Sequence, residues 1–286
     1  MDAAIDTMDL PHFDLGEFVR RVLAEDLGSG GDVTSKATID ANAHFTADMN
    51  CREPIVVAGL EIAIAFFRSC DREVRIERLV KDSDLVGEGT VLARLEGNAR
   101  AMLAAERSAL NTLQHLSGIA TLTRTYVDAI AGTGATVIDT RKTIPGLRAL
   151  EKYAVRMGGA QNHRLRLDDG VLIKDNHVAV CGGVAEAVRR AKAANTGLQV
   201  QAEVDRVSQI EPALEAGVDR LLLDNMDLAT LREAVALVAG RVPLEASGGV
   251  RLETIRGIAE TGVDFISIGR ITQSAPAVDI GLDYST

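Results

Sequence analysis

The chain has 286 residues, of which 47% are hydrophobic and 25% are charged, and these proportions exclude a disordered polar protein. Lys and Arg number 31 against 41 Asp and Glu, and the net charge of −10 argues against nonspecific binding to nucleic acids or membrane surfaces. At about 150 residues per domain, the length indicates two domains with ordinary apolar cores.

The start of the chain lacks the marks of a targeting sequence. Residues 1–11 are acidic and contain no basic region followed by an apolar stretch, so we expect no signal peptide. The longest apolar stretch, residues 55–67, contains Glu61 and is too short to span a bilayer. The three cysteines form no C-x-x-C pair, which favours reduced thiols. We therefore expect a soluble cytoplasmic protein.

The first hundred residues predict a mixed α+β domain with a small sheet. Residues 12–27 place apolar side chains at helical spacing, which predicts an amphipathic helix. A second helical pattern runs from Ala99 to about Ile130, and a break at Gly118 is left open. Short apolar runs between the two helices predict strands at residues 44–50, 52–60, 74–80 and 90–97.

Beyond residue 134, strand-like and helical segments alternate regularly. Helical stretches separate six apolar runs, which cover residues 135–140, 171–175, 198–204, 220–225, 243–248 and 265–270. This spacing is typical of βα units, which build a parallel sheet covered by helices. No run is followed by G-x-G-x-x-G or G-x-x-x-x-G-K-[ST], so the sequence supports neither a Rossmann fold nor a nucleotide P-loop.

The length of this alternating region decides between a complete and an incomplete barrel. A full eight-unit α/β barrel needs about 250 residues, and residues 118–275 are far fewer. We therefore predict an incomplete α/β barrel of six or seven strands over residues 118–275. It follows an N-terminal α+β sandwich domain over residues 1–117, with which the C-terminal tail 276–286 is a candidate to pack.

Each of the six predicted strands ends in polar residues. The ends are Asp139–Lys142, Lys174–His177, Glu203–Asp205, Asp224–Asn225, Ser247–Gly249 and Gly269–Arg270. Catalytic groups of α/β barrels come from the C-terminal ends of the strands, where the following loops converge. Six polar ends in register are hard to explain as solvated turns, so we expect a functional site there.

A positive segment stands out in this acidic chain. Residues 141–174 contain eight Lys and Arg against three Asp and Glu, which suits a small ligand with several carboxylates or phosphates. Arg148, Lys152 and Arg156 lie at helical spacing and equally fit a solvated helix face, so both interpretations stay open. His163 suits a carboxylate contact, donation of a proton or a structural role.

Two glycine-rich strand ends predict a phosphate site, because backbone N–H groups after the last strands of a barrel approach phosphates closely. They are Ser247-Gly248-Gly249 and Ile268-Gly269-Arg270. Glu203 and Asp224, at the ends of neighbouring strands, suit ribose hydroxyls, an oxygen-bound Mg²⁺ or acid–base catalysis. No H-x-H, H-E-x-x-H or two-cysteine cluster supports a protein-held zinc ion.

The motifs at these positions resemble the quinolinate phosphoribosyltransferases, a family of type II phosphoribosyltransferases. The resemblance is most specific in residues 139–177, with Asp139-Thr-Arg-Lys-Thr-Ile-Pro-Gly-Leu-Arg148, Asn162-His-Arg164 and Leu172-Ile-Lys-Asp-Asn-His177. It extends over nearly the whole chain from Glu25 and includes residues 105–111, 115–118, 203–205, 223–225, 247–249 and 279–283.

The resemblance implies a reaction, a cofactor and an assembly. The reaction joins quinolinate and phosphoribosyl pyrophosphate, with Mg²⁺, to give nicotinate mononucleotide, pyrophosphate and CO₂, a step of NAD biosynthesis. The implied protein is a homodimer with shared active sites and no nucleic-acid or membrane partner, whose N-terminal sandwich precedes an incomplete barrel. Assembly beyond the dimer is left open.

The resemblance also implies residue roles. Quinolinate would lie against Arg107, Thr140, Arg141, His163, Arg164 and Lys174, with Arg107 reaching in from the other subunit. Phosphoribosyl pyrophosphate would lie against Lys142, Glu203, Asp224, Ser247, Gly248, Gly249, Ile268, Gly269 and Arg270. The catalytic residues would be Lys142, Lys174, Glu203 and Asp224, of which Glu203 and Asp224 would also hold Mg²⁺, directly or through water.

Three alternatives remain at this point. A paralogue associated with molybdenum transport shares the barrel and several motifs, although residues 152–155 and 172–177 favour the quinolinate enzyme. Lys174 follows an apolar strand, as the Schiff-base lysine of a barrel lyase would. A non-catalytic metabolite-binding module is the third, although it would need fewer polar strand ends.

Overall fold

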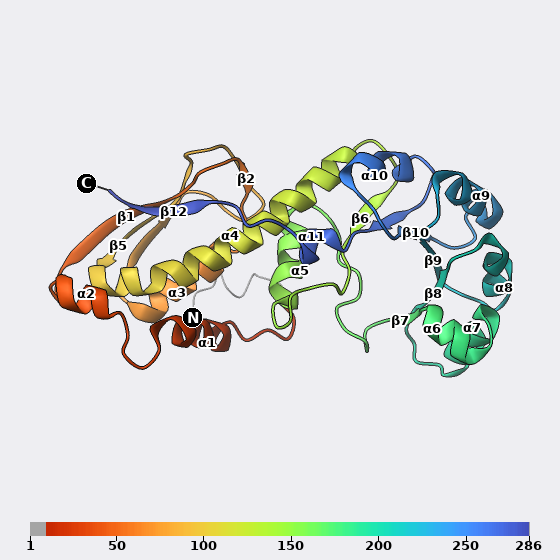
Figure 1. Cartoon of the computed structure of the whole chain (residues 1–286), viewed down its shortest axis with the longest axis horizontal. Helices are drawn as coiled ribbons and strands as arrows, with labels where there is room; N and C mark the ends of the chain where they lie inside the picture. The colour runs from red at the N-terminus through yellow and green to blue at the C-terminus, as the bar shows by residue number, and fades with distance from the viewer. Residues whose placement is uncertain (1–9, 286) are drawn as a thin grey trace. The chain divides into compact units, whose positions relative to one another are not determined.

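The computed structural model describes residues 10–285 and divides the chain into two compact units (Figure 1). The first, here called the N-terminal unit, comprises the chain as far as Arg124, Pro145–Gly159 and the segment from Ser274 onward; the second, called the barrel unit, comprises Thr125–Ile144 and Ala160–Gln273. Residues 1–9, where no signal peptide is expected, lie outside the described residues, as does Thr286. No helix among the described residues is long and apolar enough to cross a membrane.

The N-terminal unit contains an antiparallel sheet of strand order β12-β1-β5-β3. Its strands are β1 (His44–Cys51), β3 (Arg75–Arg78), β5 (Val91–Asn98) and β12 (Ile280–Tyr284), and β2 (Ile55–Val56) pairs with β4 (Leu85–Val86). Its helices are α1 (Leu15–Leu27), α2 (Val33–Thr38), α3 (Leu60–Cys70) and α5 (Arg148–Met157), with the first part of α4 (Ala99–Ala129). The prediction of a sheet with helices is confirmed, and the tail contributes β12.

The expected strand at residues 52–60 is largely wrong. Only Ile55 and Val56 are strand, and α3 begins at Leu60, after Gly59 in the left-handed region at φ 91°. Asp82 caps this helix by accepting hydrogen bonds from the backbone N–H groups of Gly59 and Leu60, at 2.7 and 3.1 Å. Because α3 is buried around most of its surface, its sequence lacks the alternation that distinguishes a helix from a strand.

The helix α4 runs without a break for 31 residues, so the break considered at Gly118 is not present. The glycine is explained by packing within the N-terminal unit. A Cβ atom at Gly118 would lie 2.1 Å from the backbone oxygen of Pro276, so only glycine allows the C-terminal segment to pass this close. Mid-helix glycine normally costs about 1 kcal/mol relative to alanine, and this contact supplies the reason for it.

The barrel unit holds a parallel sheet, six-stranded within the described residues, of order β6-β11-β10-β9-β8-β7. The strands are β6 (Thr136–Ile138), β7 (Val171–Ile173), β8 (Val200–Val204), β9 (Arg220–Asp224), β10 (Leu244–Ser247) and β11 (Phe265–Ser267). All six fall within the predicted runs, which confirms the incomplete barrel. A single bridge between Ile138 and Gln161 is all that the described residues show beyond these strands.

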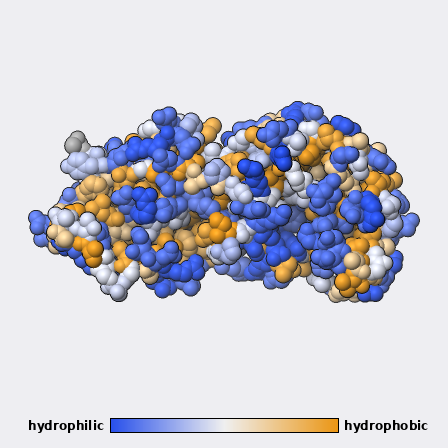
Figure 2. All heavy atoms as spheres, in the orientation of Figure 1, coloured by the Kyte–Doolittle hydropathy of each residue, from blue (hydrophilic) through white to orange (hydrophobic). Residues whose placement is uncertain are grey.

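Helices cover the outer face of this sheet (Figure 1). They are α6 (Asp175–Cys181), α7 (Val184–Ala193), the 3₁₀ helix η1 (Val207–Gln209), α8 (Ile210–Glu215), α9 (Leu228–Val238) and α10 (Leu252–Ala259), and the short α11 (Arg270–Gln273) follows β11. Alternate strand residues, such as Ala202, Leu221 and Leu223, are fully buried and apolar. Successive side chains of a strand point to opposite faces, so the positions between these face the inside of the barrel. On the face in view, apolar residues form separate patches among hydrophilic ones (Figure 2).

The basic residues of α5 do not form a solvated face. Lys152 is fully buried, while Arg148 and Arg156 are only partly exposed. The solvated interpretation is therefore wrong for Lys152. Helical spacing shows which side chains share a face of a helix, but it does not show what packs on that face.

Candidate active site

Two layers of polar side chains lie on the inner face of the barrel sheet. We call the layer at the carboxyl ends of the strands the rim, made by Lys174, Glu203, Asp224 and Ser247. We call the layer that precedes it the floor, made by Gln201, Arg220 and Glu245. Gln201 and Glu203 are two positions apart on β8, as are Glu245 and Ser247 on β10, so each pair points to the same side. The register places Gln201 opposite Arg220 and Ser247 opposite Asp224. Glu245 lies opposite Leu222, and its side chain joins the floor by accepting a hydrogen bond from Gln201 Nε2 at 2.7 Å.

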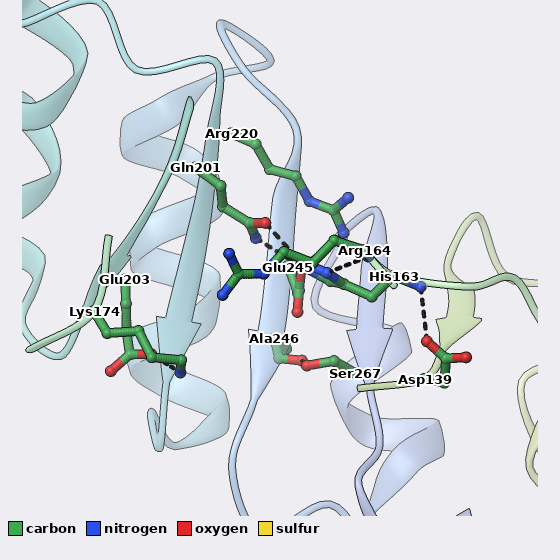
Figure 3. Close-up of polar contacts among 10 residues, drawn as sticks. All are labelled: Asp139, His163, Arg164, Lys174, Gln201, Glu203, Arg220, Glu245, Ala246 and Ser267. Carbon is green, nitrogen blue, oxygen red and sulfur yellow. Dashed lines mark hydrogen bonds and ion pairs between the residues drawn. The ribbon is translucent and has the colours of Figure 1, made fainter. Parts of the chain in front are cut away.

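An ion pair occupies one side of the rim (Figure 3). Lys174 Nζ donates to Glu203 Oε2 at 2.7 Å, with 48% of the lysine side chain and 10% of the glutamate side chain exposed. The backbone N–H of Lys174 also donates to His177 Nδ1 at 3.0 Å, which fixes the start of α6. The contact with Glu203 engages the amine that a Schiff base would need, so this geometry does not favour a Schiff-base role for Lys174.

The two rim carboxylates influence each other. Burial raises the pKa of Asp224, and the negative charge of Glu203 raises it further. Asn225 Nδ2 donates to Asp224 Oδ2 at 2.7 Å, which orients the carboxylate. Among the described residues no group of three or more His, Cys, Asp or Glu side chains could hold a metal ion. Two carboxylates fit Mg²⁺ only where water and substrate phosphates complete its coordination.

Two guanidinium groups lie close enough to repel each other. Burial lowers the pKa of Arg164, and the positive charge of Arg141 lowers it further. Arg164 Nη1 donates to the backbone oxygen of Gly170 at 2.9 Å. Placing like charges together costs free energy, which an anionic ligand between them would recover. This pair therefore suits a carboxylate.

The predicted phosphate turns have the backbone that such turns need. Gly248 lies at φ 93°, and a Cβ atom there would be 2.1 Å from Asn225 Oδ1. Asn225 in turn donates its backbone N–H to the oxygen of Ser247 at 2.9 Å. Only glycine fits at position 248, so the close approach of strands β9 and β10 shapes this turn.

The second predicted phosphate turn, at Gly269, lies against the side chain of Lys142. A Cβ atom at Gly269 would lie 2.8 Å from Lys142 Cδ, so the lysine side chain runs directly over this glycine. The oxygen Thr140 Oγ1 accepts from the backbone N–H of Lys142 at 3.0 Å, and Thr272 Oγ1 donates to the Lys142 oxygen at 2.7 Å. Ile268 is buried, and its N–H donates to Ile138, so the sheet already uses this group. Arg270 is exposed at the start of α11.

His163 makes contacts with the protein through both ring nitrogens (Figure 3). Nδ1 accepts the backbone N–H of Arg164 at 2.7 Å, and Nε2 lies 3.1 Å from Gln201 Oε1 and 3.5 Å from Glu245 Oε2. The backbone N–H of His163 donates to Asp139 Oδ1 at 2.8 Å. Nε2 is thus directed toward the floor, and Nδ1 toward the backbone of Arg164.

Sequence reasoning did not identify the floor. Gln201 and Glu245 are at most 5% exposed, and Arg220 forms an ion pair with Glu245 at 2.8 Å. The sequence does carry a signal for the floor. Polar residues interrupt the apolar strands two positions before the rim, at Gln201 and Glu245. Arg107 lies on α4 in the N-terminal unit, with its side chain 60% exposed, and its predicted role across a subunit boundary stays a prediction.

Comparison with known proteins gives the family. The sequence models for the quinolinate phosphoribosyl transferase N-terminal and C-terminal domains match residues 32–117 and 119–283. The chain belongs to the quinolinate phosphoribosyltransferase family. The similarity to individual members of the family extends over most of the chain.

Three relatives illustrate that similarity. Nicotinate-nucleotide pyrophosphorylase [carboxylating] of Mycobacterium leprae (strain TN) is 44% identical, covering 93% of this chain and 95% of its own. The crystal structure of nicotinate-nucleotide pyrophosphorylase from Ehrlichia chaffeensis superposes with a TM-score of 0.92 at 42% identity, covering 96% of this chain and 100% of its own. The structure of the nicotinate-nucleotide pyrophosphorylase from Francisella tularensis superposes with a TM-score of 0.91 at 39% identity, covering 95% of this chain and 96% of its own. These names favour the quinolinate enzyme over the molybdenum-transport paralogue.

Proposed function

We propose that this protein transfers phosphoribosyl from phosphoribosyl pyrophosphate to quinolinate with loss of CO₂, forming nicotinate mononucleotide and pyrophosphate. The observation that carries this proposal is the rim, where Lys174 pairs with Glu203 beside Asp224, together with the cations Arg141 and Arg164, which lie in loops of the same unit. Such a site can hold a dicarboxylate beside a ribose. Family membership and the names of the relatives support the same assignment.

The cations Arg141, Arg164 and Lys174 suit the two carboxylates of quinolinate. A guanidinium binds a carboxylate through two parallel hydrogen bonds, whereas an ammonium acts as a point charge. Arg141 and Arg164 would therefore hold one carboxylate between them and relieve their mutual repulsion. Lys174 would contact the other carboxylate of quinolinate, either by breaking its ion pair with Glu203 or by keeping both contacts. Thr140 lies next to Arg141 in the sequence and adds a hydroxyl to the same strand end.

The opposite part of the site suits phosphoribosyl pyrophosphate. The 5′-phosphate would lie against the turns at Ser247, Gly248, Gly249 and Gly269, with Ile268 and Arg270 beside them. Glu203 and Asp224 would contact the ribose hydroxyls and hold Mg²⁺ together with the pyrophosphate, and the bound ion would offset negative charge on that leaving group. Lys142, whose side chain runs over Gly269, would contact the pyrophosphate.

The chemistry needs positioning more than a protein nucleophile. The bond from ribose C1 to pyrophosphate breaks with its electron pair on the leaving oxygen, and the quinolinate nitrogen supplies the pair for the new bond. Carboxylates near C1 stabilise the positive charge that develops, while Lys142 stabilises the departing oxygens. The resulting pyridinium accepts the electron pair released when CO₂ leaves C2, and a proton takes its place. Holding both substrates in one orientation lowers the barrier to the first step.

Three further elements of the proposal rest on the family resemblance. The protein acts as a homodimer, Arg107 of one subunit reaches the quinolinate site of its partner, and the enzyme works in the cytoplasm. Light scattering of the purified protein measures the dimer. Mixing Arg107→Ala with an inactive Lys174→Ala variant tests sharing, because hybrid dimers regain activity only if the two residues serve one site from different chains.

Release of CO₂ tests the proposed reaction directly. The assay uses quinolinate labelled at the 2-carboxylate, with phosphoribosyl pyrophosphate and Mg²⁺ added together and left out in turn. Release that requires all three, with an equal amount of nicotinate mononucleotide, is the expected result. If the folded protein releases no CO₂ with all three components present, the assignment is refuted.

A further inference from the structure

The floor of the barrel forms one connected set of contacts that ends at His163. Gln201 Nε2 donates to Glu245 Oε2 at 2.7 Å, and the Oε1 atom of the same glutamine lies 3.1 Å from His163 Nε2. Arg220 forms an ion pair with the same Glu245 oxygen at 2.8 Å. Figure 3 shows Gln201, Glu245 and His163 pointing toward one another, with Arg220 beside the glutamate.

These contacts determine where the ring hydrogen of His163 lies. Nδ1 accepts the backbone N–H of Arg164 at 2.7 Å, so it presents a lone pair. Gln201 already donates its amide hydrogens toward Glu245, so its Oε1 faces the ring as an acceptor. The hydrogen of the neutral ring must then be on Nε2, pointing to Gln201. The floor thereby selects one of the two tautomers of His163.

Burying the charged groups of the floor costs too much free energy for the floor to be explained by a contribution to stability. Glu245 is 1% exposed, and its Oε1 atom is buried without a hydrogen-bond partner among the described residues. Arg220 is also mostly buried, with its guanidinium carbon 3.9 Å from the centre of the Phe265 ring. An apolar core of the same volume is often as stable as a buried ion pair. A role in orienting the groups above it accounts for this cost.

The groups that face His163 connect the floor to the rim. Glu245 and Gln201 approach the ring from β10 and β8, Arg220 lies behind Glu245, and Asp139 accepts the backbone N–H of His163 at 2.8 Å. The ring then accepts from the backbone of Arg164, whose guanidinium belongs to the proposed carboxylate site. A shift of the ring would therefore move Arg164.

We propose that Gln201 and Glu245 are positioning residues that hold His163 in its Nε2–H tautomer, and that His163 holds the backbone of Arg164 in place for the substrate carboxylate. In this arrangement His163 orients the binding arginine, a role in addition to the substrate contact that the family resemblance implied. The effect on quinolinate rests on the proposed function, whereas the tautomer does not.

The test combines ¹⁵N shifts of the His163 ring nitrogens with steady-state kinetics. Gln201→Met keeps the size of the side chain and removes both hydrogen-bonding groups, while Glu245→Gln removes the charge. Glu211→Gln is the matched control, because Glu211 also pairs with an arginine, Arg241 at 2.7 Å, but does so at the surface. Histidine ¹⁵N shifts, assigned by comparison with His163→Gln, report which nitrogen carries the hydrogen.

We expect the unmodified protein to show an unprotonated Nδ1 and a protonated Nε2 at His163, and Gln201→Met to lose this preference. We expect either floor variant to raise the KM for quinolinate about tenfold, because small misplacements of a binding group cost up to about 100-fold, with the KM for phosphoribosyl pyrophosphate changed less than about twofold. The control should match the unmodified protein in both measurements.

Several outcomes would overturn the inference. Protonated Nδ1 in the unmodified protein excludes the proposed tautomer, and unchanged KM for quinolinate in folded Gln201→Met excludes the positioning role. If Glu245→Gln does not fold, Gln201→Met decides, because it leaves the ion pair of Glu245 with Arg220 in place. If the unmodified protein releases no CO₂ from quinolinate, the proposed function fails, and the ring shifts, measured without substrate, still test the tautomer.

Discussion

The rim and the floor carry the same kinds of side chain on the same strands, but they meet opposite conditions. Burial raises the pKa of Asp224 at the rim, and Glu203 adds to the increase. Burial also acts to raise the pKa of Glu245 in the floor, but the contacts from His163, Arg220 and Gln201 outweigh it and lower the pKa. The floor carboxylate has a cation from the protein, Arg220. The rim is therefore the layer that needs a ligand to balance its charges.

The largest effect is expected at the proposed quinolinate site, from Arg141→Ala. Loss of one guanidinium should lower kcat/KM for quinolinate by about 10²–10³-fold, because an electrostatic contact to the reacting anion is removed. The matched control is Arg166→Ala, whose arginine lies in the same positive segment but pairs with Asp168 at 2.8 Å near the surface. Initial rates measure both variants. Equal losses in the two would mean that general positive charge, and not the proposed quinolinate site, accounts for binding.

The next largest effect is expected from Gly248→Ala. The new methyl group would clash with Asn225 Oδ1 and reshape the phosphate turn, so the KM for phosphoribosyl pyrophosphate should rise about tenfold or more. Gly182→Ala is the control, because Gly182 lies at φ 83° at the end of α6 with nothing within 4 Å of a Cβ atom. A similar change in both variants would assign the effect to backbone strain alone.

The floor should show its effect in the acid stability of the protein. Because the pKa of Glu245 is lowered in the folded state, its ionisation stabilises the fold above the ordinary glutamate pKa of about 4.3, and this contribution is lost as the pH falls further. Glu245→Gln should lower the free energy of unfolding by about 3 kcal/mol at pH 7, because it leaves Arg220 buried without its anion. The difference from the unmodified protein should shrink below pH 4. Urea unfolding at several pH values measures it, and a difference independent of pH would contradict the ionised pair.

The smallest effect is expected from Glu211→Gln, which removes the exposed ion pair with Arg241 on the outside of the barrel unit. Exposed pairs are screened by water and contribute little to stability. The thermal midpoint and the kinetic constants should both stay within experimental error. A clear fall in the midpoint would show that surface pairs matter here as much as the buried pair of the floor.

The sequence predicted the rim better than the floor for a physical reason. All six barrel strands were recognisable, because buried parallel strands are continuous apolar runs and polar residues mark their ends. Gln201 and Glu245 lie inside those runs, and their partners come from other strands, so no local pattern announces them. The ring orientation of His163 depends on both residues and could not be predicted without the sheet register. The burial of Lys152 was missed similarly, because it depends on packing between distant segments.

The open sheet also affects how the molecule behaves when concentrated. A closed barrel has no edge strand, whereas this sheet ends at β6, whose free side bonds to the backbone of Gln161, and at β7. An exposed edge can pair with a strand of another molecule and start aggregation. β7 is only three residues long, and charged side chains flank it at Asp168, Asp169 and Lys174. Short, charged edges are poor templates for a foreign strand. The chain thus protects its sheet against polymerisation at the place where the barrel fails to close.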